Sequence, residues 1–90
     1  MFDWDDLRVF LAVARMRKVA PAARALGIDA TTIARRLARL ERALGADLFE
    51  PAAGERALTP RGQALLRHAE GVESAALAAM EEVQGRAQRL

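Results

Sequence analysis

Residues 26–29, with the sequence LGID, form a tight connection between two stretches of helical periodicity, and this connection most constrains the fold. Gly27 suits the left-handed conformation just past a helix end, and Asp29 can cap the start of the next helix. A short helix over about 20–26 and a longer one over about 30–44 are therefore predicted. In the longer helix, apolar residues recur every three or four positions: Ile33, Leu37, Leu40 and Leu44. Two helices joined in this way are the elements of a helix-turn-helix.

A first helix is predicted over about 4–16. Asp3 can cap its N-terminus, and Asp6 stands three residues later, where a capping box has an acidic or amide side chain. An apolar stripe at helical spacing follows: Leu7, Phe10, Leu11 and Ala14. The 90 residues leave no room for a second independent core, so a single small domain is expected.

A hairpin and a long helix are predicted for the second half of the chain. Two short strands over 47–50 and 56–59 are joined by a turn that contains Pro and Gly. Thr59 as N-cap and Pro60 at the first helical position then open a helix that runs to about residue 88. An apolar seam with spacings of three and four residues follows this helix: Leu65, Ala69, Val72, Ala76, Ala79 and Val83. Because a helix of roughly 43 Å is longer than so small a domain can cover, we expect the seam to pack against a second copy, giving a homodimer.

The composition restricts the classes of function. The chain has no Cys, one His and one Ser, so a nucleophile and base pair or a thiolate metal site is not expected. We expect neither an enzyme nor a bound metal or cofactor. The N-terminus lacks the basic segment of an export signal, and the apolar runs are too short to cross a bilayer. These features predict a cytoplasmic protein without a membrane anchor.

Positive charge is concentrated in one part of the chain. Residues 15–42 carry a net charge of +6, whereas residues 1–14 and residues 43–90 each carry −2. On the helix over 30–44, the positions away from the apolar stripe hold hydroxyl and guanidinium groups and no carboxylate: Thr31, Thr32, Arg35, Arg36, Arg39 and Arg42. Arg can bind guanine bidentately or hold a phosphate, and Thr can meet the methyl group of thymine. This face predicts that the helix enters the major groove of double-stranded DNA.

The position of each residue along the helix predicts its role. The first turns are expected to face base edges and the nearest phosphates, and four residues there are candidates: Thr31, Thr32, Arg35 and Arg36. Arg39 is expected to reach the DNA backbone, and Arg24 on the preceding helix is a candidate for a phosphate contact. The alternative is a helical dimerisation module whose basic face binds an acidic protein partner. Steep salt dependence of DNA affinity would separate the two, because neutralised phosphates release counterions.

The sequence resembles the N-terminal winged helix-turn-helix domain of the LysR-type bacterial transcriptional regulators. The matching stretches occur in the same order and without a gap: Leu7 to Ala14, Ala22 to Ile28, Arg35 to Glu50 and Leu58 to Gly62. The resemblance implies a mostly α-helical fold with a three-helix core, a two-stranded β wing and a long helix that dimerises. It implies a DNA-binding domain over residues 1–62 and a linker helix over residues 60–90. It also implies a further domain that binds a small-molecule inducer, and these 90 residues are not expected to sense an effector.

Departures from the family pattern concern the expected DNA contacts. Lys18 stands where Ser is usual and is a candidate for a charge contact to phosphate. Ala30 opens the recognition helix, where Gln is frequent and can read adenine. Pro51 follows the first strand where Arg is common, and Glu55 adds a negative charge to the wing. Arg56 is therefore the candidate DNA contact in the wing.

Overall fold

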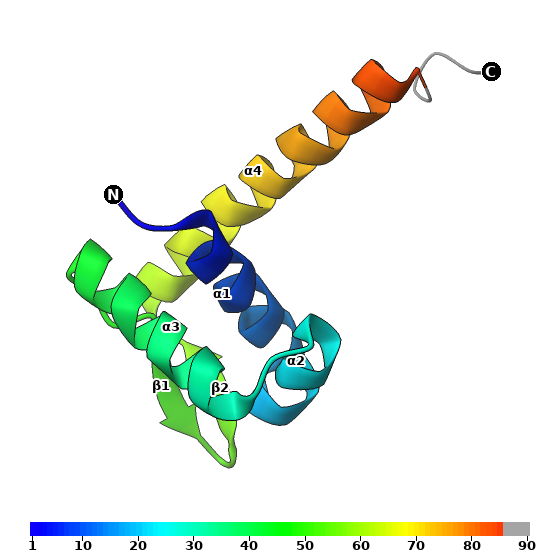
Figure 1. Ribbon diagram of the computed structural model, residues 1–90. Helices are drawn as coiled ribbons and strands as arrows, with labels where there is room; N and C mark the ends of the chain where they lie inside the picture. Colours follow the sequence, from blue (N-terminus) through cyan, green and yellow to red (C-terminus); the bar gives the residue numbers. More distant parts are fainter. Residues whose placement is uncertain (86–90) are drawn as a thin grey trace.

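The computed structural model describes residues 1–85, which form four helices and one two-stranded antiparallel sheet (Figure 1). In chain order the elements are α1 (Trp4–Met16), α2 (Val19–Leu26), α3 (Ala30–Leu44), β1 (Phe49–Ala52), β2 (Glu55–Leu58) and α4 (Pro60–Gln84). This order confirms the predicted three-helix core, wing and long final helix. Within residues 1–85, no helix is long and apolar enough to cross a membrane.

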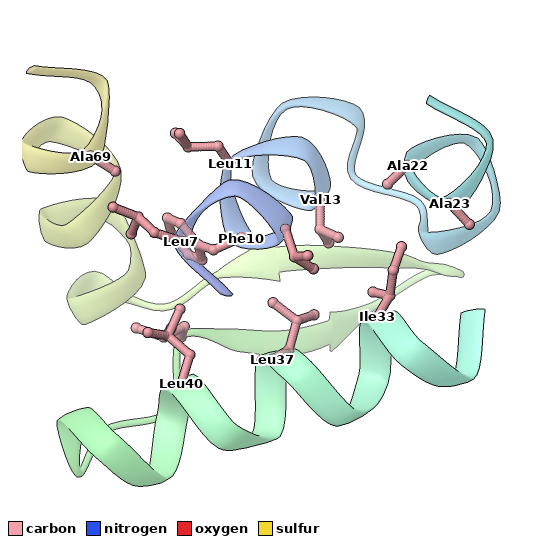
Figure 2. Packing of buried hydrophobic residues seen from close by; sticks show 12 residues of the cluster. Leu7, Phe10, Leu11, Val13, Ala22, Ala23, Ile33, Leu37, Leu40 and Ala69 are labelled. Atoms are coloured by element: carbon pink, nitrogen blue, oxygen red, sulfur yellow. The ribbon is translucent and has the colours of Figure 1, made fainter. Parts of the chain in front are cut away.

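Helix α1 lies at the centre of the fold, where it contacts α2, α3, α4 and β2. Contact on several sides buries more of this helix than one stripe predicts, so Val9 and Val13 are buried together with the expected Leu7, Phe10 and Leu11. Ala14, also predicted for the stripe, is only half-buried. Figure 2 shows the apolar stripe of α3 pointing toward α1 and the β-strands, with the small side chains of α2 completing the core: Ile33, Leu37, Leu40, Ala22 and Ala23.

Most of the residues predicted as caps are found at the start or the end of a helix. The Asp29 carboxylate accepts the Thr32 N–H at 2.7 Å, and the Thr59 hydroxyl accepts the Gly62 N–H at 3.0 Å. Gly27 adopts the left-handed conformation, with φ of 70°, directly before the turn into α3. These local signals set the angle at which α2 leads into α3, as a helix-turn-helix requires.

Only one of the two residues predicted to form a capping box at the start of α1 caps the helix. Asp3 does cap the helix, because its side chain accepts the Asp5 N–H at 3.1 Å. Asp6 does not reach back to the helix start. Its side chain is 1% exposed and pairs with α3 instead.

The hairpin is shifted relative to its prediction. The strands occupy residues 49–52 and 55–58, so Pro51 lies within β1, opposite Arg56. The turn is only two residues long: Ala53 and Gly54 have φ of 47° and 79°, the positive pair that a tight hairpin turn requires. Pro is tolerated in β1 because each strand of a two-stranded sheet has a free edge. Ala rarely adopts positive φ, so the sequence suggested a longer turn.

The first turns of α4 belong to the core of the single chain. Ala69 is 1% exposed, so it is not available to the dimer seam predicted from the sequence. Leu65 packs against the same core and is half-buried. From residue 74 to residue 84, every side chain on α4 is exposed, and the helix extends away from the rest of the fold (Figure 1). The helix predicted to run to about residue 88 is shorter in the structure, because α4 ends at Gln84 and Gly85 caps it in the left-handed conformation, with φ of 79°. Residues 86–90 lie outside the described residues.

Candidate nucleic-acid interface

Helix α3 exposes the predicted polar face on the side opposite its buried stripe. Ala30, Thr31 and Arg35 are exposed, whereas Thr32 and Arg36 are half-buried. Because Ile33, Leu37 and Leu40 pack into the core, the rotation of α3 about its axis is fixed. The first turns of α3 therefore present hydroxyl and guanidinium groups to solvent.

The N-cap of α3 is a charged carboxylate. The hydrogen bond from the Thr32 N–H lowers the pKa of Asp29 below its ordinary value, and Arg35 nearby adds to this effect. A negative charge at this position also interacts favourably with the positive end of the helix dipole. Asp29 therefore stabilises the first turn of α3, which carries the candidate base-reading side chains.

Arg39 is held by an ion pair that the sequence did not reveal. Its Nε and Nη2 atoms donate to the two oxygens of Asp6 on α1, at 2.7 and 2.6 Å. The hydrogen bond with Asp6 raises the pKa of Arg39, and its side chain remains half-exposed. The charge that Arg39 was expected to offer to the DNA backbone is thus largely offset within the protein.

Arg36 also lies on the side of α3 that faces α1. It lines a small pocket of about 50 Å³ together with Asp5 and Arg8 of α1 and Leu26 and Ile28 of the turn. The exposed surface of α3 therefore divides into two parts. Thr31 and Arg35 are on the outer face, and Arg36 and Arg39 are on the flank toward α1.

The connection between α1 and α2, residues 17–18 (the α1–α2 corner), lies beside the wing formed by β1 and β2. The Arg56 N–H donates to the Arg17 carbonyl at 2.8 Å, and the Arg17 side chain is 3.9 Å from Glu55. Lys18 and Arg56 both line a surface pocket of about 390 Å³ between the corner and the hairpin. Two of the candidate phosphate contacts, which are 38 positions apart in sequence, are thus brought to one surface.

Lys18 is the N-cap residue of α2, and its side chain makes no capping hydrogen bond. A Ser at this position would offer a hydroxyl to the first backbone N–H groups, and Lys cannot accept a hydrogen bond. Arg24, the remaining candidate, is exposed in the last turn of α2. Within the described residues, no side chain caps the first backbone N–H groups of α2, and the side chain next to them carries a positive charge.

The outer half of α4 exposes an apolar surface. Four of the six residues predicted for the dimer seam lie there and are exposed: Val72, Ala76, Ala79 and Val83. Leu77 and Met80, which the sequence prediction omitted, are 52% and 54% exposed beside them. Leu77, Met80 and Val83 follow one another at intervals of three residues, which is a helical spacing, so a wider stripe could have been read from the sequence.

Two polar contacts in the core region were also missed. Asp6 stands on the stripe that contains Val9 and Val13, and its spacing of three and seven residues from them signals that it is buried. The Glu41 carboxylate accepts the Leu48 N–H at 2.8 Å and so fixes the chain between α3 and β1. For Glu41 the sequence carries no such signal, because the bond depends on how the chain turns after Gly45.

Comparison with known proteins agrees with this geometry. The sequence profile of the family described as "Bacterial regulatory helix-turn-helix protein, lysR family" matches residues 4–63. The "Mau operon transcriptional activator" of Paracoccus denitrificans is 47% identical over 74 residues, which is 82% of this chain and 26% of that protein. The "Probable hydrogen peroxide-inducible genes activator" of Mycobacterium avium is 46% identical over 70 residues, or 78% of this chain and 22% of that protein. The chain thus spans about a quarter of the length of these curated relatives.

Solved structures share the complete fold. The protein in the "BenM_DBD/catB site 1 DNA Complex" superimposes with a TM-score of 0.87 at 25% identity, covering 99% of this chain and 100% of that one. The protein in the "CbnR_DBD-DNA complex" gives a TM-score of 0.83 at 29% identity, covering 96% of this chain and 99% of that one. Both similarities include the long last helix as well as the core and wing. With the profile match over residues 4–63, they establish that this chain belongs to the LysR family of bacterial regulatory helix-turn-helix proteins.

Proposed function

We propose that this chain is the sequence-specific DNA-binding part of a LysR-type bacterial transcriptional regulator. The observation that carries the proposal is the outer face of α3, where exposed Thr31 and Arg35 stand on a helix whose opposite side is fixed in the core. A helix-turn-helix reads DNA by placing such a face in the major groove. The two solved structures above are described as complexes with DNA, which is consistent with this use of the fold.

The candidate contacts divide into base-reading and phosphate-binding groups. Thr31 and Arg35, with Ala30 and Thr32 beside them in the first turn, face the base edges. Arg36, on the flank toward α1, is placed for the nearest phosphates. Three further residues hold the DNA backbone from elements around α3: Lys18, Arg24 and Arg56. Arg39 keeps a part in backbone binding only through the guanidinium N–H groups that Asp6 does not occupy.

The functional unit is proposed to be a homodimer formed through α4. Two copies that pack their outer α4 halves together bury the exposed apolar side chains, among them Val72 and Val83. Paired recognition helices then meet two half-sites of a partly palindromic operator. In this scheme residues 1–62 form the DNA-binding domain, and residues 60–90 form the linker and dimerisation segment, whose described helix is α4.

Binding to an acidic protein partner is the weaker alternative. It gains no support from the relatives reported above, whose names are those of transcriptional regulators. An enzymatic function gains none for the same reason. The distinguishing property remains the salt dependence of DNA affinity.

The test is a titration of the chain against random-sequence duplex DNA at two salt concentrations, with the mass in solution determined on the same sample. We expect a dimer that binds with Kd in the range of about 10⁻⁴–10⁻⁶ M at physiological salt and more tightly at low salt. A folded dimer with no affinity for DNA at low salt would contradict the proposal.

Dimerisation is tested by placing a charge in the exposed apolar surface. Val72→Asp with Val83→Asp should shift the chain to monomer and weaken its binding to duplex DNA. Ser74→Asp with Ala78→Asp is the matched control, because both residues are exposed on the side of α4 away from Val72 and Val83, so two charges there should leave the mass unchanged. Equal masses for both variants would contradict the assigned dimer surface.

A further inference from the structure

An ion-pair cluster of Arg15, Glu70 and Glu73 joins α1 to α4. The Arg15 Nη2 atom is 2.7 Å from Glu73 Oε1 and 3.4 Å from Glu70 Oε2, and Nη1 is 3.2 Å from Glu73 Oε2. The hydrogen bond with Glu73 raises the pKa of Arg15, and the same bond lowers the pKa of Glu73. Arg15 also lies in the last turn of α1, where a cation interacts favourably with the helix dipole.

The cluster stands where α4 leaves the body of the domain. Ala69, one turn earlier on the same face of α4, is 1% exposed in the core. Glu73 is half-buried, and beyond it the side chains of residues 74–84 are all exposed. Among the described residues, Glu73 is the last side chain of α4 that forms an ion pair or hydrogen bond with another element. Ala69 and the cluster together set the direction of the exposed half of the helix.

Small changes in that direction have large effects at a distance. The two shorter dimensions of the molecule are 26 and 22 Å. Across such a width, a rotation of about 10° displaces the far side by about 4 Å, which is close to the 3.4 Å rise of one base pair. In a dimer held by α4, the same rotation changes the separation of the two recognition helices.

We propose that Arg15, Glu70 and Glu73 are positioning residues that select the spacing between the two half-sites of the operator. This inference rests on the proposed function, since it requires a dimer that binds DNA. Exposed ion pairs contribute little to folding stability. The cluster can therefore be removed without unfolding the domain, and its loss affects the direction of α4 rather than the base-reading face of α3.

The first experiment measures the direction of α4 without DNA. The chain has no Cys, so Ala43→Cys and Ala78→Cys on exposed positions of α3 and α4 give two unique spin-labelling sites. Labelled chains are diluted into excess unlabelled chain, so that only the distance within one chain is measured. Glu70→Gln with Glu73→Gln should broaden or shift the distance distribution. The matched control is Glu81→Gln with Glu82→Gln, which neutralises two exposed carboxylates on the same helix and should leave the distribution unchanged.

The second experiment measures spacing preference. Duplexes are selected from a random pool with the parent chain, and the separation of the selected half-sites is then changed by one or two base pairs. For the Glu70→Gln, Glu73→Gln variant we expect affinity for a single half-site to stay within about twofold, while the preference for the selected spacing falls about tenfold. Arg15→Glu with Glu73→Arg reverses the main ion pair and should restore part of that preference.

The outcomes distinguish failure of the spacing role from failure of the proposed DNA-binding function. A distance distribution that does not change on removing the carboxylates overturns the inference, whatever the DNA results. So does a parallel loss of single half-site affinity, spacing preference and melting temperature, because the cluster would then only stabilise the fold. A parent chain that binds no duplex contradicts the proposed function and the spacing role with it, while the label distances still show whether the cluster directs α4.

Discussion

Arg39 on α3 and Asp6 on α1 form a bidentate ion pair across 33 positions of sequence, with N to O distances of 2.7 and 2.6 Å. Asp6 is 1% exposed and is the buried charged side chain of the described core. Its two oxygens are both occupied by Arg39, so the carboxylate is satisfied only while α3 keeps its place against α1. The pair therefore ties the recognition helix to the central helix of the domain.

Removing Arg39 should destabilise the fold more than removing a similar exposed residue, because it leaves a buried carboxylate without a partner. We expect Arg39→Ala to lower the melting temperature clearly more than Arg42→Ala, an exposed arginine on the same helix. Asp6→Ala should cost about 1.5–3 kcal/mol, the range for hydrogen bonds to a charged group. The double variant should be more stable than Arg39→Ala alone, since the unpaired charge is gone. Equal melting temperatures for Arg39→Ala and Arg42→Ala would show that the pair contributes nothing.

Arg35 is exposed on the outer face of α3, whereas Arg39 is paired with Asp6. Loss of Arg35 should therefore affect DNA binding rather than folding stability. Arg35→Ala should weaken binding to a selected operator by about 5- to 150-fold, corresponding to about 1–3 kcal/mol, and weaken random-sequence binding much less. Lys18→Ala and Arg56→Ala should weaken both kinds of binding alike and reduce the salt slope by about one unit each. Competition binding against operator and random duplexes at several salt concentrations measures these effects. An Arg35→Ala variant that lost the same factor on both duplexes would remove Arg35 from the base-reading group.

Phe49 is half-buried at the start of the wing, and its ring centroid lies 5.4 Å from that of the fully buried Phe10, at an interplanar angle of 48°. Phe49→Ala should cost about 2–3 kcal/mol, below the value for a fully buried Phe, because part of the ring is already in water. Phe49→Leu keeps most of the apolar contact and should cost less. Denaturant unfolding of the three proteins gives the comparison. No loss of stability in Phe49→Ala would mean that the wing does not rest on the core through this ring.

The features that the sequence predicted well depend on near neighbours. The stripe of α3, the Asp29 cap and the Gly27 turn are all determined within about one helical turn of chain. The features it missed depend on which elements meet. The Arg39 and Asp6 pair requires α3 to cross α1, and Ala69 is buried only because α4 packs back on α1. Ala53 is different, since its positive φ is imposed by a two-residue turn that Ala itself does not favour.

The lowered pKa of Asp29 predicts an effect of pH on stability. A carboxyl group with a lower pKa in the folded state adds stability above its unfolded pKa, and that contribution is lost as the pH falls through the folded pKa. Asp29→Ser keeps a neutral cap for the Thr32 N–H and removes the charge. The parent should therefore melt at a higher temperature than Asp29→Ser near pH 7, and the gap should close as the pH falls below about 4. A gap that stays constant from pH 7 to pH 2 would show that the charge of the cap is unimportant.

Two glycines on α4 should respond to the same substitution in opposite directions. A Cβ on Gly62 would stand 2.1 Å from the Leu48 carbonyl oxygen and 2.9 Å from Leu58 Cδ2, so the backbone of the wing or the helix would have to move. Gly62→Ala should cost about 3 kcal/mol, at the upper end for overpacking in a core. Gly71 has nothing within 4 Å of its Cβ position and lies on an exposed face. Gly71→Ala should stabilise the chain by about 0.5–1 kcal/mol, because Ala restricts the unfolded chain and favours the helix. Thermal and denaturant unfolding measure both, and a Gly62→Ala variant as stable as the parent would mean that α4 does not start in close contact with the Leu48 backbone.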